Sequence, residues 1–152
     1  MNLTAKSRYA VTAMLDLSAQ KEEKPVSLAD ISRRQEISLS YLEQLFVKLR
    51  KNGLVRSIKG PGGGYLLARS ADEVTVADIV DSVDENVDVT RCSGKGNCQR
   101  GAVCLTHELW SEFSDEIRNY LSGINLENLK GREHVKRVLS RQEGKQEAEV
   151  FF

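Results

Sequence analysis

Apolar residues recur at helical spacing near the start of the chain. Over residues 7–20 one stripe carries Ala10, Val11, Met14, Leu15 and Ser18. These steps of three and four residues predict a first helix with one buried face. Further on, Ser27 is a good N-cap, and Asp30 occupies the third helical position, where a carboxylate can complete a capping box. We therefore expect a second, short helix over about residues 28–35.

A third stripe begins after a tight turn at residues 36–38. Its apolar positions are Leu42, Leu45, Phe46 and Leu49. This spacing predicts a longer helix, capped by Ser38 or Ser40 and ended by the Asn52-Gly53 pair. The opposite face carries Ser40, Glu43, Gln44, Val47, Lys48 and Lys51, with Tyr41 and Arg50 at its edges. This pattern predicts a helix-turn-helix over about residues 28–51, whose second helix enters the major groove of DNA.

Two short apolar runs flank a glycine-rich tip within about residues 54–68 and predict a β-hairpin. The tip, residues 60–64, reads GPGGG and follows Lys59. A phosphate-binding loop is a poor interpretation of these glycines, because it needs a Lys followed by Ser or Thr and a helix, and here Tyr65 opens a strand. Glycine-rich tips are often only turns. A cationic tip directly after a helix-turn-helix nevertheless favours a DNA-binding wing.

A fourth helix is expected from Val76 to about Val83, capped by Thr75. After a loop, a long apolar stripe predicts another helix: Leu105, Leu109, Phe113, Ile117, Tyr120, Leu121 and Ile124. One small domain has little core left for so long a stripe. The helix therefore either packs back on the domain or, as we expect, pairs with its twin in a second subunit, since helix-turn-helix proteins commonly bind two-fold sites.

The whole pattern predicts a mainly α-helical protein built around a winged helix-turn-helix. The expected parts are a winged helix-turn-helix domain at residues 1–83, a ligand loop at 84–104, a dimerisation helix with a short following helix at 105–130, and a tail at 131–152. The tail is charged, so we expect it to be mostly flexible. Val135, Val138 and Leu139 would hold at most one more helical turn, with disorder from Ser140 onward.

The net charge of zero conceals an asymmetry between the two halves. Residues 1–70 carry 12 Lys and Arg against 6 Asp and Glu, and residues 71–152 carry 10 against 16. The basic half suits contacts with DNA phosphates, although such a split often reflects only solvated helix faces. No signal peptide and no apolar run of membrane-spanning length are visible. We therefore expect a soluble cytoplasmic protein with reduced thiols and no membrane partner.

All three cysteines lie in one short segment, residues 92–107, which reads CSGKGNCQRGAVCLTH. The spacing is Cys-x5-Cys-x5-Cys-x2-His, and the intervening glycines permit the positive φ angles that a loop needs to turn its ligands inward. The expected metal ligands are Cys92, Cys98, Cys104 and His107. If Leu105 opens the next helix, Cys104 and His107 share one face of its first turn.

Three thiolates and one imidazole suit either a tetrahedral zinc site or a [2Fe–2S] cluster. The x5 gaps are wider than those of zinc knuckles, which favours iron and sulfur. Loose cysteines are usually scattered, and an odd number fits a closed disulfide set poorly. An enzyme is not expected, because no third orienting group accompanies Cys104 and His107. An electron carrier would have no use for a helix-turn-helix, whereas a zinc- or thiol-redox-responsive repressor remains the alternative.

The candidate DNA contacts lie on the second helix of the motif and at the hairpin tip: Ser38, Ser40, Tyr41, Glu43, Gln44, Lys48, Arg50, Lys51, Lys59, Gly60, Pro61 and Gly62. The cations among them should mostly contact phosphates. The residues between 40 and 44 are better placed for base edges, because Gln can bind adenine bidentately and Glu can accept from cytosine N4.

Three stretches resemble the Rrf2 family of winged-helix regulators, and most closely its iron–sulfur cluster-sensing members: LTAKSRYAVTAMLDL, SLADISRRQEISLSYLEQLFVKLRKNGLVRSIKGPGGGYLLA and the cysteine segment. The resemblance runs from Met1 to about Leu129. It implies a homodimer formed through the long C-terminal helix. It also implies one [2Fe–2S] cluster per subunit, ligated by Cys92, Cys98, Cys104 and His107 and supplied by the iron–sulfur assembly machinery.

The function that this resemblance implies is transcription regulation. Such a regulator acts as repressor and activator of genes for cluster biogenesis, and it binds double-stranded promoter DNA with and without its cluster, at different classes of site. No motif departs from the family pattern, so the resemblance favours iron and sulfur over zinc.

Overall fold

The computed structural model describes residues 4–20, 23–83 and 87–150, with side chains as far as Gly144. The elements are α1 (Ala5–Ala19), α2 (Leu28–Gln35), α3 (Leu39–Lys51), β1 (Val55–Ile58), β2 (Gly64–Leu67), the 3-10 turn η1 (Ala71–Glu73), α4 (Val76–Ser82), α5 (His107–Ser122), α6 (Leu126–Lys130) and α7 (Glu133–Val150). The predicted mainly helical fold with a small antiparallel hairpin is confirmed. Predictions that fall on residues 1–3, 84–86 and 151–152 lie outside the described residues.

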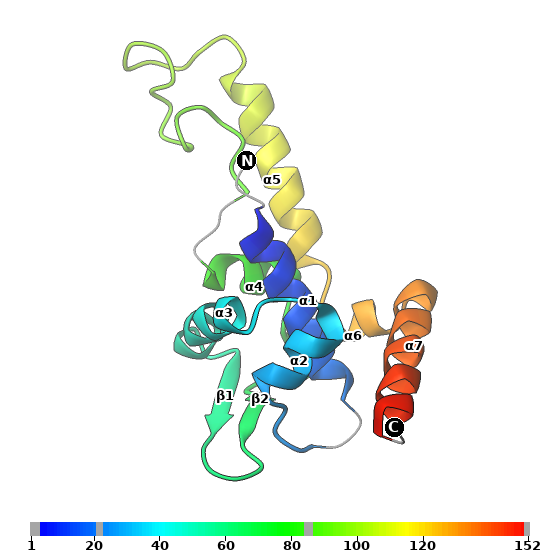
Figure 1. Cartoon of the computed structure of the whole chain (residues 1–152). Coiled ribbons are helices and arrows are strands. Elements are labelled where there is room, and N and C mark those ends of the chain that lie inside the picture. Colours follow the sequence, from blue (N-terminus) through cyan, green and yellow to red (C-terminus); the bar gives the residue numbers. More distant parts are fainter. Residues whose placement is uncertain (1–3, 21–22, 84–86, 151–152) are drawn as a thin grey trace.

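Helix α1 lies at the centre of the domain, against α2, α3, α4 and α6 (Figure 1). Its buried residues are Ser7, Ala10, Ala13, Met14, Asp16 and Leu17. The predicted stripe is only partly right, because Val11, Leu15 and Ser18 are half-buried. A helix that other helices surround has more than one buried face, so a single apolar stripe understates its burial.

Helices α2 and α3 form the predicted helix-turn-helix. The Ser27 hydroxyl accepts a hydrogen bond from the Asp30 backbone N–H at 3.1 Å. The Asp30 carboxylate does not complete a capping box but accepts a hydrogen bond from Arg33 at 3.1 Å. Glu36, in the left-handed conformation at φ 57°, ends α2, and Ile37 is buried in the turn.

The second helix of the motif, α3, begins after Ser38, whose hydroxyl accepts a hydrogen bond from the Tyr41 N–H at 3.4 Å. Its apolar face is buried as predicted: Leu42, Leu45, Phe46 and Leu49. Gly53, with φ 74°, takes the left-handed position that follows the helix. The core beneath α3 therefore fixes which face of the helix remains open to a partner.

The hairpin β1–β2 is the predicted wing. Its register pairs Val55 with Leu67 and Ile58 with Gly64. A second link ties it to the segment before α2, because Val26 and Tyr65 exchange two backbone hydrogen bonds of 2.9 and 2.8 Å. Any Cβ at Gly64 would lie 2.4 Å from the Val26 carbonyl oxygen, so only glycine fits this contact.

Helix α5 projects from this domain and carries the cysteine segment at its far end, remote from the hairpin (Figure 1). It begins at His107, later than the predicted start at Leu105, which is 99% exposed. Cys104 therefore precedes the helix, and its carbonyl accepts the His107 N–H at 3.3 Å in a turn. Among the described residues, no helix is both long and apolar enough to cross a bilayer.

The end of the chain differs most from expectation. In place of a single turn followed by disorder, α7 continues as a helix to Val150. Two causes act together. Glu, Lys, Arg, Gln and Ala have high helix propensity, and the half-buried Val135, Val138 and Leu139 lie on one stripe that faces Val11 and Leu15 of α1.

Candidate functional site

Three of the four predicted metal ligands lie together. The ligand atoms of Cys92, Cys98 and His107 are all within 4.8 Å of one another. The His107 Nδ1 atom is 3.4 Å from the Cys92 sulfur and 3.6 Å from the Cys98 sulfur. Because His107 is the first residue of α5, the start of this helix fixes the imidazole, and the preceding loop brings the two sulfurs to it.

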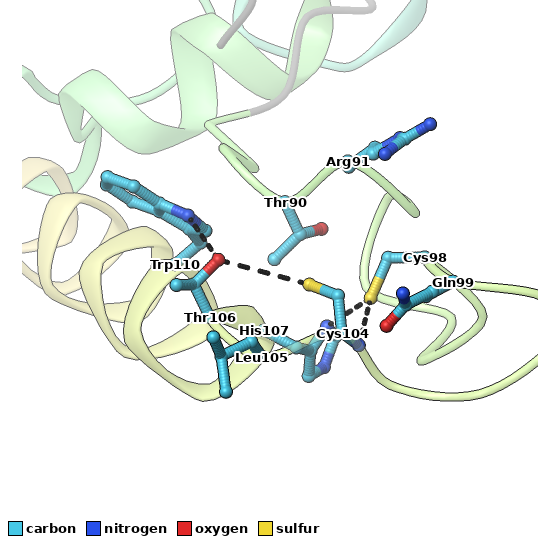
Figure 2. A pocket seen from close by; sticks show the side chains of 9 residues that line it. All are labelled: Thr90, Arg91, Cys98, Gln99, Cys104, Leu105, Thr106, His107 and Trp110. Carbon is cyan, nitrogen blue, oxygen red and sulfur yellow. Dashed lines mark hydrogen bonds between the residues drawn. The ribbon is translucent and has the colours of Figure 1, made fainter.

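Cys104, the fourth predicted ligand, lies beside the other three, but its sulfur is not among the atoms that meet within 4.8 Å. Its backbone N–H donates to the Cys98 sulfur at 2.9 Å, and its own sulfur is 4.0 Å from the Thr106 hydroxyl. Figure 2 shows the Cys98 sulfur facing His107 and the Cys104 sulfur on the side of Thr106. Both cysteines line one hollow of about 350 Å³ with His107 and Trp110.

Short polar contacts fold the loop around Cys92. The Thr90 hydroxyl accepts the Gly94 N–H at 2.7 Å, and the Cys92 sulfur accepts the Gly96 N–H at 3.3 Å. Gly94 and Gly96 have φ angles of 81° and 73°, as the sequence predicted for a loop that turns its ligands inward. These turns hold the Cys92 sulfur among backbone N–H groups.

This environment changes the acidity of the three thiols. Burial raises the pKa of Cys92, but hydrogen bonds from the Gly96 N–H, the Thr90 hydroxyl and other loop N–H groups outweigh it and lower that pKa to about 6. Burial raises the pKa of Cys98 in spite of the Cys104 N–H. The contact with Cys98 lowers the pKa of Cys104. A lower pKa favours the thiolate, the metal-binding form, at Cys92 and Cys104.

A buried serine joins this loop to α5. The hydroxyl of Ser114 accepts the Val89 N–H at 2.8 Å and donates to the Trp110 carbonyl at 2.8 Å. Trp110 in turn donates its indole N–H to Thr106 at 3.1 Å. The sequence analysis did not identify Thr90 and Ser114 as residues that organise the loop. Ser114 could have been noticed as a small polar residue within the apolar stripe of a helix.

The candidate DNA contacts lie on one side of α3 and at the hairpin tip. The exposed members are Ser38, Ser40, Glu43, Gln44, Arg50, Lys51, Lys59, Gly60, Pro61 and Gly62. Tyr41 and Lys48 are half-buried. Ser38 uses its hydroxyl to cap α3 and lies 3.0 Å from the Ser40 hydroxyl. The Tyr41 ring packs edge-on against Tyr9, with centroids 5.7 Å apart, which adds an aromatic side chain of α1 to this edge.

The apolar stripe of α5 divides between two environments. Ile117, Leu121 and Ile124 pack against a buried cluster of Val76, Val80 and Val87. Other large apolar side chains of the helix are exposed: Leu109, Trp110, Phe113 and Tyr120. One part of the stripe therefore packs back on its own domain. The other part leaves an exposed apolar face, which is available for pairing with a second subunit.

Comparison with known proteins bears on both the fold and the site. The profile of the Rrf2 family, described as iron-dependent transcriptional regulators, matches residues 3–132. A regulator named HTH-type transcriptional regulator IscR, from Photorhabdus laumondii, is 59% identical over 143 residues, which are 94% of this chain and 87% of the relative. The regulator of the same name from Escherichia coli O1:K1 is 57% identical over 142 residues, 93% and 88% of the two chains.

Two solved structures share this fold. The global cysteine regulator CymR of B. subtilis has a TM-score of 0.73 and 32% identity over 85% of this chain and 95% of its own. IscR of T. potens has a TM-score of 0.69 and 34% identity over 85% of each chain.

Proposed function

The chain belongs to the Rrf2 family of DNA-binding transcriptional regulators, which are not enzymes, and we propose that this member senses a [2Fe–2S] cluster. The cluster would be held by Cys92, Cys98, Cys104 and His107, one in each subunit of a homodimer. The observation that carries the proposal is that the ligand atoms of Cys92, Cys98 and His107 lie within 4.8 Å of one another. They lie at the end of α5, the helix that projects from the winged helix-turn-helix domain.

The donor set fits such a cluster. A [2Fe–2S] cluster takes four terminal ligands from the protein, and three are already gathered. Cys104 lines the same hollow, and a change of its χ1 rotamer re-aims the sulfur without moving the backbone. When bound, the group would supply a one-electron centre that depends on iron, sulfide and oxidant supply. The iron–sulfur assembly machinery is the proposed donor, and we place the regulator in the cytoplasm.

A chain of contacts supports coupling between this loop and the DNA surface. Val89 binds Ser114 of α5, and Arg118 of α5 donates two hydrogen bonds, of 3.1 and 2.8 Å, to Asp81 of α4. One residue beyond Asp81, the Ser82 carbonyl accepts from the side chain of Asn52, which follows α3, at 3.4 Å. Order in the loop can therefore shift the placement of α3 through α5 and α4, and with it the preferred DNA site.

The identity of the metal is tested by anaerobic purification with iron, acid-labile sulfide and zinc analysis. We expect iron and sulfide in equal amounts, a visible absorption spectrum and DNA binding by the same sample. The alternative is a zinc- or thiol-redox-responsive repressor, for which the low pKa of Cys92 is the favouring observation. A colourless protein that contains zinc would contradict the proposed cluster and favour a zinc-responsive repressor. A metal-free protein whose DNA binding responds only to thiol oxidation would favour a thiol-redox-responsive repressor.

The cations of the DNA surface should contact phosphates. We expect Lys51→Ala and Lys59→Ala each to weaken binding to all DNA sites about equally. Each should also reduce the magnitude of the slope of log K against log salt by about 0.9, because each lost phosphate contact means that about one counterion fewer is released from the DNA on binding. Titrations at several salt concentrations measure this slope. Lys95→Ala, on the exposed loop remote from the hairpin, is the matched control and should leave it unchanged. Equal slopes for all three variants would mean that the surface is placed wrongly.

Glu43 should discriminate against DNA sites that lack a suitable hydrogen-bond donor. It is exposed on α3, and in the described part of the chain it has no ion-pair or side-chain hydrogen-bond partner. Its carboxylate is repelled by DNA unless a donor such as cytosine N4 meets it. We therefore expect Glu43→Ala to strengthen binding severalfold at sequences that lack this donor, and so to narrow the gap between site classes.

The competing role for Glu43 is support of the helix start. Ser38 rather than Ser40 caps α3, so Glu43 does not complete a capping box with Ser40. Affinities for two duplexes that differ at the contacted base pair, measured beside thermal unfolding, separate the roles. A lower melting temperature with unchanged site preference would indicate that Glu43 only stabilises the start of α3 and does not discriminate between DNA sites.

A further inference from the structure

Helix α7 is docked on the DNA-binding domain by one apolar stripe. Val135, Val138 and Leu139 follow the i, i+3, i+4 pattern, and Gln142 continues it at i+7. With Val11, Leu15 and Leu129 these residues line a hollow of about 250 Å³. The other side of the helix is exposed, at Lys136, Arg137, Ser140 and Arg141. This helix begins after residue 132, where the match to the family profile ends.

Gln142 joins α7 to the last turn of α2. Its side-chain amide and that of Gln35 donate to each other, at 3.0 and 2.9 Å. The Gln142 amide also lies 3.4 Å from the Arg34 carbonyl, one of the acceptors that the end of a helix leaves without an intrahelical partner. One side chain of α7 thus satisfies both the side chain and the backbone of the residues that end α2.

Beneath this contact lies a buried ion pair between α1 and α2. Arg34 donates to both carboxylate oxygens of Asp16, at 2.9 and 2.8 Å, and their side chains are only 8% and 1% exposed. The hydrogen bond to Asp16 raises the pKa of Arg34 against the effect of burial, so the guanidinium stays charged. Gln35 donates to the same carboxylate at 2.7 Å. The network therefore runs from α1 through Asp16 and Gln35 to Gln142 of α7.

This network lies directly before α3, the helix that is proposed to bind DNA. Arg34 and Gln35 are followed at once by Glu36 in its left-handed conformation, by buried Ile37 and by Ser38, which caps α3. The end of α2 and the start of α3 are thus separated only by a short, well-fixed turn. Whatever fixes the end of α2 also fixes the direction in which the first turn of α3 leaves it.

We infer that Gln142 is a positioning residue for DNA binding, through which α7 braces the end of α2 and thereby sets how α3 is presented to the major groove. The inference rests on the proposed function. Gln142 itself contacts no DNA in this account and acts through Gln35. The C-terminal helix is then a working part of the DNA-binding unit.

The test uses the full chain and a duplex that the wild-type protein binds. We expect Gln142→Ala to lower the affinity about fivefold, a factor that corresponds to the net contribution of one hydrogen bond. The salt slope should be unchanged, because no phosphate contact is lost. Ser140→Ala, an exposed change on the same helix, is the matched control and should behave as wild type. Gln35→Ala should weaken binding at least as much, because it also removes the hydrogen bond to Asp16. Because the two side chains share their mutual hydrogen bonds, the loss in the double variant should be smaller than the sum of the two single losses.

Three results would overturn the inference. These are an unchanged affinity for Gln142→Ala, losses that add in the double variant, and a lower salt slope, which would indicate a direct phosphate contact. If the affinity is unchanged and the melting temperature falls, the contact is purely structural. Failure of the wild-type protein to bind any duplex is a different outcome, because it removes the proposed function itself.

Discussion

Replacing Cys92, Cys98 and Cys104 together with alanine should abolish cluster binding and yet leave a folded protein that still binds one class of DNA site. The cysteines take no part in either hydrophobic cluster of the domain, whose largest buried side chains include Met14, Phe46 and Leu49. The loop that carries them lies at the far end of α5 (Figure 1). Loss of the ligands should therefore remove the sensor and spare the DNA-binding fold.

Iron and sulfide content, thermal unfolding and DNA affinity measure these effects together. We expect no iron, a melting temperature close to that of the cluster-free wild type, and affinity retained at one class of site but lost at the other. Val103→Ala, which alters an exposed loop residue without removing a ligand, is the control and should keep the cluster. Unfolding or complete loss of DNA binding by the triple variant would make the loop a structural metal site, and cluster sensing would have to be abandoned.

Phe113→Glu should prevent formation of the proposed dimer and lower DNA affinity by about two to four orders of magnitude. The exposed apolar face of α5 includes Phe113 at 47% exposure and Leu109 at 55%, and pairing with a second copy would cover it. A charge there would be buried without a partner on association. Affinity falls steeply because each subunit then binds one half-site alone, without the gain that linked binding provides.

Sedimentation and DNA titration of the same sample check this prediction. Asn119→Glu introduces the same charge on the exposed polar side of α5 and should remain dimeric. Dimers of Phe113→Glu with undiminished affinity would show that the subunits pair through another surface, and the role of the long helix would have to be revised.

The helix-turn-helix and the wing could be predicted from the sequence because their determinants are local. The stripe from Leu42 to Leu49, the caps at Ser27 and Thr75 and the glycines of the hairpin tip each act within a few residues of themselves. The spacing of the cysteines and His107 is likewise local, and it predicts a ligand loop within one short segment. The structure brings Cys92, Cys98 and His107 together, and their role as ligands stays a prediction.

Other features depend on contacts between distant parts of the chain and were missed. Val135, Val138 and Leu139 form too short a stripe to predict a helix of 18 residues, and its docking partners on α1 are more than a hundred positions away. Asp16 looks like a solvated charge in its helix until Arg34 and Gln35 are placed against it. The start of α5 at His107 instead of Leu105 was also missed, because helix ends are poorly defined by periodicity.

Occupancy of the cysteine and histidine site should set which DNA sequences the protein prefers. The most direct measurement is selection from a library of random-sequence duplexes, performed without air on one preparation of the protein with and without its cluster. We predict two different consensus sequences, one for each form, and both with two-fold symmetry. A single consensus selected by both forms would contradict it, because the cluster would then have no differential effect on the DNA-bound states.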